Sequence, residues 1–266
     1  MAAEAGNGAS GRAGTGGGAA AGVAAPKVPE RSFVDLHCHT SASFDSLSDP
    51  VAVVRAAARR GLTHLAITDH DRIDGALRAR DAAPAGLTVI VGEEVKTADG
   101  DLVALFLERP IPPGLPAEET VEAIRAQGGL AGIPHPFDRF RFSGMAAGQD
   151  TGVLERLALL VDFVEAHNAR VTYAGANDRA AAFAREHGLA GIAVSDAHTV
   201  MEVGIAYAVL EGPIGTAEDL LGALAKITPA VLVRGRGSLL VRGFMPVAKA
   251  IQRVRGNRRV PPGGAR

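Results

Sequence analysis

Histidine and carboxylate side chains gather in five short polar segments of this sequence, and each segment follows an apolar run. The segments read Asp35-Leu-His37-Cys-His39-Thr, Thr68-Asp69-His70-Asp71, Gly92-Glu93-Glu94-Val, Pro134-His135-Pro136 and Ser195-Asp196-Ala-His198. Side chains alternate along a strand, so His37 and His39 should share one face, as should Asp196 and His198. Imidazole and carboxylate groups are nitrogen and oxygen ligands of zinc, manganese and iron. The pattern therefore predicts a metal-dependent hydrolase.

The composition is typical of a globular enzyme. The chain has 266 residues, of which 47% are apolar, so it can bury a full core, and its net charge of −1 argues against a protein that coats nucleic acid. The only cysteine, Cys38, excludes an internal disulfide and favours a reducing compartment. No apolar run approaches the roughly 18–20 residues that span a bilayer, and the N-terminus lacks the features of a secretory signal. We expect a cytoplasmic protein of undetermined oligomeric state.

Residues 1–30 are almost entirely Ala and Gly with scattered small polar residues. Such a segment cannot bury enough apolar surface to offset the entropy of ordering, so we expect a disordered tail. Its Gly14-Thr-Gly16-Gly-Gly-Ala19 stretch is similar to a dinucleotide-binding loop, but no strand precedes it. We therefore interpret it as part of the tail.

From residue 31 to residue 230, apolar runs alternate with helical patterns, which predicts one α/β domain. Repeated strand–helix units favour a parallel sheet that closes into a barrel with its chemistry at the carboxyl ends of the strands. An Asp99-Gly100 turn between two of the runs predicts a hairpin instead. The expected strands are Phe33–His39, Thr63–Asp69, Leu87–Val95, Asp101–Leu107, Leu130–His135, Val161–His167, Ala190–Ser195 and Ile205–Leu210. The expected helices are Asp49–Arg60, Ile73–Ala83, Pro116–Gln127, Val153–Leu159, Asn177–His187 and Thr216–Ala225.

The order of the five segments resembles that of the PHP (polymerase and histidinol phosphatase) metallohydrolases, from about Phe33 to about Leu210. In that family a His-x-His motif is followed by an acid, then Thr-Asp-His, a glutamate after glycine, His-Pro and Ser-Asp-Ala-His. The resemblance implies a distorted (β/α)7 TIM-like barrel with two to three divalent ions (Mn, Fe or Zn). The ligands that it implies are His37, His39, Asp45, His70, Glu94, His135, Asp196 and His198.

The resemblance also implies how these ligands are shared. His37, His39, Glu94 and Asp196 would hold a first ion, and Glu94 and His135 a second. Asp45, His70 and His198 would hold a third. Glu94 would bridge two ions because a shared anion offsets the repulsion between them, and Glu94 and Asp196 would be the catalytic residues. His167 is a further candidate for the second ion.

Neighbouring polar residues are expected to play other parts. Glu93 and Asp69 point away from the adjacent candidate ligands, so Glu93 should have a buried partner and Asp69 should orient a ligand. Cys38, between His37 and His39, should be structural. His64 and His187 lie away from the five segments and are expected at the surface.

The resemblance implies a phosphoesterase, in which water activated by metal hydrolyses a phosphate ester. Arg139, Arg141 and Arg170 follow candidate ligands closely and would bind the phosphate. Residues 231–266 carry nine basic and no acidic residues and should include a terminal helix. Because this charge lies in a terminal segment and not around the ligand loops, we expect a small phosphorylated substrate and not nucleic acid. The alternatives are a nuclease for short oligonucleotides, or a non-catalytic metal-binding module that docks on polyanions through the basic segment.

Overall fold

The computed structural model describes residues 31–138, 151–173, 175–228, 231–238 and 243–259. The expected tail over residues 1–30 lies outside these ranges. The strands are β1 (Arg31–Asp35), β2 (His64–Ile67), β3 (Thr88–Lys96), β4 (Asp101–Leu105), β5 (Leu130–Ile133), β6 (Phe163–Asn168), β7 (Ala190–Val194), β8 (Ala206–Glu211) and β9 (Leu232–Arg234). The helices are α1 (Pro50–Arg59), α2 (Asp74–Asp81), α3 (Ala117–Arg125), α4 (Thr151–Ala158), α5 (Ala176–Glu186), α6 (Ala217–Leu224) and α8 (Met245–Val254).

Local sequence signals set the ends of several helices. Asp49 caps α1 by accepting hydrogen bonds from the amides of Val51 and Ala52, and proline occupies the first helical position. Thr216 and Asp219 form a reciprocal capping box at the start of α6. None of the helices in the described ranges has the length and apolar character that a bilayer span requires.

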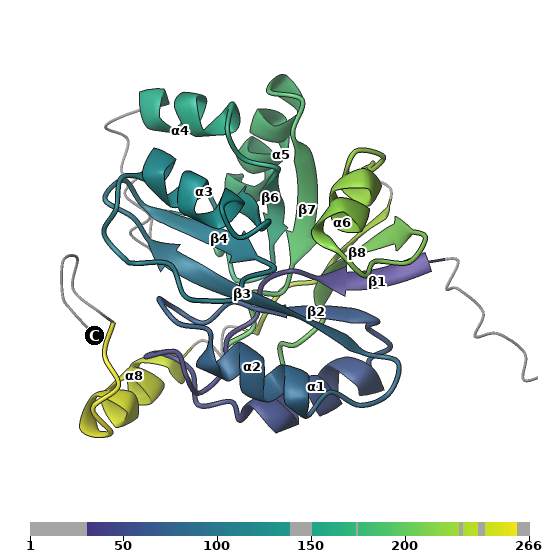
Figure 1. The fold of residues 1–266 in the computed structure, drawn as a ribbon. Helices are drawn as coiled ribbons and strands as arrows, with labels where there is room; N and C mark the ends of the chain where they lie inside the picture. The colour runs from purple at the N-terminus through teal and green to yellow at the C-terminus, as the bar shows by residue number, and fades with distance from the viewer. Residues whose placement is uncertain (1–30, 139–150, 174, 229–230, 239–242, 260–266) are drawn as a thin grey trace, which may run out of the picture.

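The nine strands form one sheet in the order β7-β6-β5-β4-β3-β2-β1-β8-β9, which curls into a nearly closed barrel (Figure 1). The pairs β1–β2, β2–β3, β5–β6 and β6–β7 are parallel. The expected hairpin joins β3 to β4, so β4 runs antiparallel to both neighbours. Strand β8 is also antiparallel to β1. The fold is therefore the expected distorted TIM-like barrel, and these reversed strands account for much of the distortion.

The barrel closes at the carboxyl ends of its strands. Beyond β1 and β7 the chain continues in two parallel segments, where the Asp196 amide donates to the His37 carbonyl at 2.9 Å and the His39 amide donates to the Ala197 carbonyl at 2.8 Å. Both segments contain candidate ligands. The backbone bonds that close the barrel therefore also fix the positions of the histidines.

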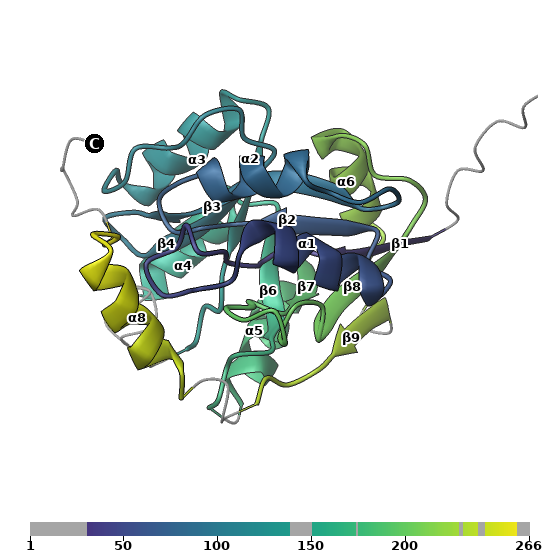
Figure 2. The same cartoon turned by 90° about the horizontal axis from the view of Figure 1, so that it is seen from below.

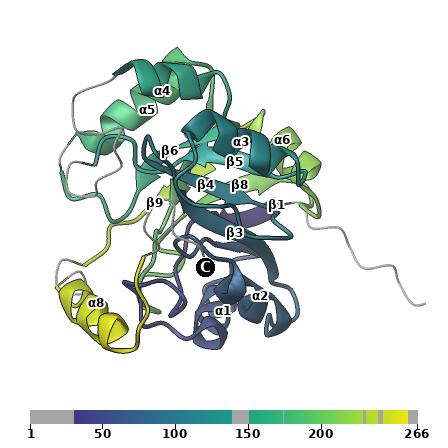
Figure 3. The same ribbon diagram turned by 60° about the vertical axis from the view of Figure 1, so that its left-hand side comes forward.

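Apolar side chains fill the barrel and the space between its strands and the surrounding helices. Phe163 is fully buried in the interior cluster. A Cβ atom at Gly132, on the neighbouring strand, would lie 2.1 Å from the Phe163 ring, so only glycine fits there. Helices α1 and α2 lie on the opposite side of the barrel from α4 and α5 (Figures 1 and 3), whereas α8 stands apart from the helices that flank the strands (Figure 2).

Candidate metal centre

All eight expected metal ligands converge at the carboxyl ends of the barrel strands. Their side chains are at most 9% exposed, His70 being the most exposed. Strand β3 directs Glu94 to one face and Glu93 to the other, where Glu93 accepts a hydrogen bond from the Ile111 amide. The remaining ligands come from loops: His37 and His39 after β1, Asp45 before α1, His70 after β2, His135 after β5, and Asp196 and His198 after β7.

One cluster forms around His37 and His39. Their Nε2 atoms lie 2.9 Å apart. Glu94 Oε2 lies 3.3 Å from His37 Nε2 and 3.2 Å from His39 Nε2. Asp196 Oδ1 lies 3.8 and 3.6 Å from the same two nitrogens. Two imidazoles and two carboxylates thus face one point, and they are the four residues that the family resemblance implies for the first ion.

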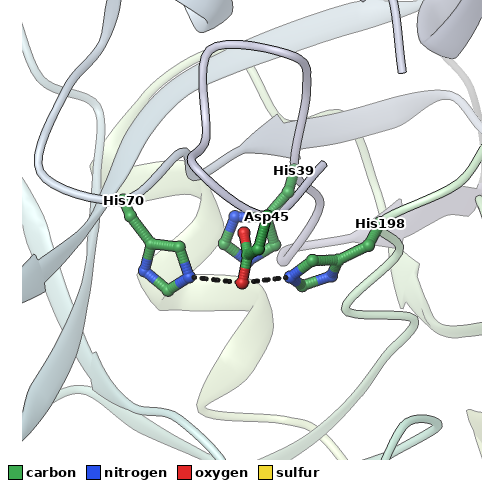
Figure 4. Close-up of side chains that lie close together, drawn as sticks. All are labelled: His39, Asp45, His70 and His198. Carbon is green, nitrogen blue, oxygen red and sulfur yellow. Dashed lines mark ion pairs between the residues drawn. The ribbon is translucent and has the colours of Figure 1, made fainter. Parts of the chain in front are cut away.

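A second cluster consists of Asp45, His70, His198 and, in addition, His39, and its possible ligand atoms all lie within 4.8 Å of one another (Figure 4). Asp45 Oδ2 lies 3.5 Å from His70 Nε2 and 3.3 Å from His198 Nε2. His39 was expected only in the first group. The structure places it between the two groups, because its ring lies beside that of His37 in the first group and beside those of His70 and His198 in the second.

Glu94 lies at the centre of the whole arrangement. Its Oε2 atom approaches three histidines, including His70 Nδ1 at 3.2 Å. Its Oε1 atom instead lies 3.4 Å from His135 Nε2. One carboxylate therefore faces different ligand groups through its two oxygens, which is the arrangement that a bridging ligand needs.

Hydrogen bonds to the second ring nitrogen fix how the histidines are oriented. His37 Nδ1 lies 2.5 Å from Glu165 Oε1, and an ionised carboxylate can only accept. His39 Nδ1 lies 2.9 Å from Ser43 Oγ, whose own proton goes to Asp69 Oδ1 at 2.8 Å. Both Nδ1 atoms must therefore donate. Asp69 thus orients a candidate ligand, His39, through Ser43.

The residues fit divalent cations. In their neutral forms, His37 and His39 would direct two Nε2 lone pairs at each other, so the site requires positive charge between them. Burial alone would lower the pKa of His37, yet Glu165 and Glu94 raise it to about 10. By contrast, burial and the Arg170 cation lower the pKa of His198 to about 3. Its ring is therefore neutral and has a nitrogen lone pair free to bind a metal.

Two candidate ligands stand on strained backbone. His135 has φ of 27° and Asp196 has φ of 50°, in a region that L-residues other than glycine rarely adopt. Buried hydrogen bonds hold both, because the His135 amide donates to Glu165 Oε2 and the Asp196 amide to the His37 carbonyl. Such strain is concentrated at functional sites, where the surrounding structure enforces it.

Sequence reasoning did not identify Glu165 and Asn168 as part of the site. Glu165 holds His37 and His135, and the Asn168 amide group donates to both Glu165 and Asp196. A β-bulge between Glu165 and His167 shifts the register, so positions 165 and 168 face the site in place of 165 and 167. His167 instead hydrogen-bonds to the Gly235 carbonyl and to the Asn177 side chain, away from the ligands.

The surface position expected for His64 was wrong. His64 is 5% exposed, and its Nε2 atom lies 2.8 Å from the Ile214 carbonyl. His187 is partly exposed and contacts Glu155, in line with the expectation for it. Cys38 is buried in the apolar core. None of these three residues belongs to the metal-ligand clusters found among the described residues.

A cavity of about 230 Å³ opens onto the ligands, and Arg170 forms part of its wall. Arg170 is buried and lies 3.6 Å from Glu202. Arg139 and Arg141, the other two residues expected to bind phosphate, lie outside the described residues. The full lining consists of Phe44, Asp45, His70, Glu94, Asp101, His135, Arg170, His198, Met245, Lys249 and Arg259.

The C-terminal segment is docked beside the ligands, which corrects the expectation that its charge lies away from their loops. Buried Gln252 of α8 donates to the carbonyls of Ser41, Ser43 and Ser46 at 2.6–2.9 Å, in the loop that carries Asp45. Asn257 donates to the Ala42 carbonyl at 2.8 Å. The premise that favoured a small substrate over nucleic acid is therefore wrong.

Comparison with known families and proteins agrees with the family resemblance seen in the sequence. The model of the PHP domain matches residues 35–160, and the model of the PHP-associated region matches residues 174–228. An uncharacterized protein of Methanocaldococcus jannaschii is 34% identical over 176 residues, which cover 65% of this chain and 68% of that protein. A second uncharacterized protein from the same organism is 39% identical over 114 residues, which cover 39% of this chain and 67% of that protein. A 5'-3' exoribonuclease of Haemophilus influenzae is 32% identical over 117 residues, covering 39% and 42%.

Solved structures share the fold at low sequence identity. A two-domain protein from Bacteroides vulgatus, described as containing a predicted PHP-like metal-dependent phosphoesterase, superposes with a TM-score of 0.62 at 19% identity. The match covers 75% of this chain and 65% of that one. A lesion-specific endonuclease from Pyrococcus furiosus gives a TM-score of 0.52 at 17% identity, covering 75% and 57%.

Proposed function

The chain belongs to the PHP-domain family, and on that premise we propose that it is a metal-dependent phosphoesterase. The observation that carries this proposal is the position of Glu94. Its carboxylate oxygens lie within 3.2–3.4 Å of nitrogen atoms of four histidines: His37, His39, His70 and His135. A buried acid among so many imidazoles suits a cluster of divalent ions.

The proposed ligands follow the two clusters in the structure. His37, His39, Glu94 and Asp196 would hold one ion, and Asp45, His70 and His198 another, with His135 and Glu94 available for a third. Mn, Fe or Zn suits this mixture of nitrogen and oxygen donors. Bound there, such ions lower the pKa of water toward neutrality and polarise phosphoryl oxygens.

The chain's own side chains would orient the reaction. Glu165 and the Ser43–Asp69 pair keep the Nε2 atoms of His37 and His39 turned inward. Arg170 presents a cation at the cavity wall, where a guanidinium can pair with phosphate oxygens. Glu94 and Asp196 would act as the catalytic carboxylates, because both reach the centre of the first cluster.

Hydrolysis of short oligonucleotides is the second candidate. Two similar proteins are described as an exoribonuclease and an endonuclease, and the basic C-terminal segment borders the cavity. A non-catalytic metal-binding module is disfavoured, since such a protein need not keep all eight candidate ligands.

Phosphate release from a panel of substrates would test this proposal. The panel contains phosphorylated metabolites, mononucleotides and short oligonucleotides, and each is incubated with protein loaded with Mn, Fe or Zn. Replacing Glu94 with Gln should lower the rate at least tenfold, which is about 1.4 kcal/mol of barrier, without changing the circular dichroism spectrum. The matched control is Glu122→Gln on the exposed face of α3, which should leave the rate unchanged. Failure of every metal form on every substrate would refute the proposal, as would full activity of the Glu94 variant.

A further inference from the structure

A second cavity adjoins the metal cavity and is strongly basic. It has a volume of about 480 Å³ and is lined by Phe44, Lys249, Arg253, Asn257, Arg258 and Arg259. Phe44, Lys249 and Arg259 also line the metal cavity, so the two spaces share a wall. Among the described residues no acid lines this second cavity, which we call the basic groove.

Three cations of the basic groove have no carboxylate partner among the described residues. Lys249, Arg253 and Arg258 are exposed, and no carboxylate of the described residues forms an ion pair with them. Lys249 lies 5.3 Å from the Phe44 ring centroid, which keeps its ammonium group near the wall shared with the metal cavity. Uncompensated cations lining a concave surface attract anions and bind them where the geometry allows.

The fourth cation, Arg259, has a structural role instead. It lies 2.7 Å from Asp101 and 3.1 Å from Asp71, and both carboxylates are buried. Together with the hydrogen bonds of Gln252 and Asn257, this pairing anchors the segment on the barrel. The groove is therefore formed before any ligand arrives, which reduces the entropy lost on binding.

A third cavity, which borders α8 and the metal ligands, is mostly apolar. It has a volume of about 310 Å³ and runs from Asp45 and His198 along Leu47, Val200, Phe244 and Val247. Its charged lining consists of two acids, Asp45 and Asp49, and one cation, Arg170, and most of its other lining residues are apolar. A ligand phosphate held at the metal cavity thus has an apolar surface on one side and the basic groove on the other. Of these two spaces formed by the described residues, the groove has the more cations and no carboxylate, so it accommodates a second anionic group more favourably.

We propose that the basic groove is a subsite for a second phosphate of the substrate, next to the phosphate ester at the metal cavity. This inference rests on the proposed function and specifies its substrate class: a molecule with at least two separated phosphates. Residues 245–259, which form most of the groove, lie beyond both matched segments, 35–160 and 174–228. The groove is therefore a feature of this chain in addition to what the two family models describe.

A second phosphate can come from a nucleic-acid strand or from a small bisphosphorylated metabolite. Two substrate pairs distinguish these sources: thymidine 5'-monophosphate against the 5'-phosphorylated dithymidylate, and glucose 6-phosphate against glucose 1,6-bisphosphate. In each pair only one member has a second phosphate. A preference in the nucleotide pair alone indicates a strand, and a preference in the sugar pair alone indicates a metabolite.

Binding to the metal-free full-length protein tests the groove separately from catalysis. Titration calorimetry in EDTA at low ionic strength should show the two-phosphate member of at least one pair binding roughly 2- to 30-fold more tightly, since two exposed ion pairs contribute on the order of 0.2–1 kcal/mol each. The double variant Arg253→Gln/Arg258→Gln should lose this preference. Arg255→Gln removes an exposed charge from the same segment but does not line the groove, and it should retain the preference.

Turnover by the metal-loaded protein gives the second readout. The ratio of kcat/KM between the two members of the preferred pair should fall about fivefold in the double variant, and it should be less sensitive to salt than in the wild type. Equal binding of both members of both pairs would overturn the proposal, as would a preference that survives in the double variant. If no phosphoester is turned over but the binding preference depends on Arg253 and Arg258, the proposed function fails and the subsite stands.

Discussion

The Glu165→Gln substitution should weaken metal binding by disturbing a residue that the metal does not touch. Glu165 is 1% exposed, and its Oε2 atom accepts from the His135 amide and the Asn168 side chain. The carbonyl oxygen of a glutamine would have to face these two donors. Its NH2 group would then face His37 Nδ1, placing a donor against a donor. To restore a hydrogen bond, His37 must carry its proton on Nε2, the atom that faces the site.

The magnitude follows from the bond that is lost. A buried hydrogen bond to a charged group contributes about 1.5–3 kcal/mol, which corresponds to roughly 10–100-fold in an equilibrium constant. Loss of residues that orient metal-bound histidines has an effect of the same size. We therefore expect the Mn²⁺ dissociation constant of the Glu165→Gln protein to rise by roughly 10–100-fold.

Competition with a fluorescent chelator measures this constant, and circular dichroism shows whether the fold is intact. Glu122→Gln, at an exposed position on α3, makes the same chemical change away from the site and should bind Mn²⁺ like the wild type. A well-folded Glu165→Gln protein whose dissociation constant lies within about twofold of the wild type would refute the reasoning, because a tenfold effect is the least that the lost bond implies.

Three further predictions concern pH, stability and the N-terminus. Because Glu165 and Glu94 raise the pKa of His37 to about 10 against the effect of burial, an ion must displace a proton from this ring at neutral pH. The apparent affinity for Mn²⁺ should therefore rise by about tenfold per pH unit between about pH 6 and 8, and a flat profile would contradict the assignment. Arg259→Met leaves the buried carboxylates of Asp71 and Asp101 without this hydrogen-bonded cation and should lower the unfolding free energy by about 1–3 kcal/mol, seen as a loss of several degrees in Tm. Deletion of residues 1–29 should change neither Tm nor rate, and a large drop in either would show that the tail contributes contacts.

The polar segments could locate the site because the ends of strands and the burial of their residues are encoded locally. Apolar runs that end in histidine or carboxylate residues predict where parallel strands reach the same edge, and His37, Glu94 and Asp196 lie there. The Asp99-Gly100 turn similarly predicted the β3–β4 hairpin. Sequence alternation does not encode the direction of a strand relative to its neighbours, so the antiparallel placement of β8 against β1 could not be read from residues 206–211.

The remaining features depend on contacts between distant parts of the chain. The bulge in β6 arises from its pairing with β7, and without it a period of two directs His167 and not Asn168 toward the site. The position of the basic segment depends on Gln252 and Asn257 donating to backbone carbonyls near residue 42. Any loop offers such carbonyls, so no sequence pattern identifies which loop receives the segment.

The most direct test of the central claim is phosphate release from the preferred substrate as a function of metal added to metal-stripped protein. The account predicts no release from the stripped protein, a rise with added Mn, Fe or Zn that saturates at two to three equivalents per chain, and no recovery in the Glu94→Gln variant. Activity that persists at full rate in the stripped protein would contradict the account. Full activity of the Glu94→Gln variant after metal is added would contradict it as well.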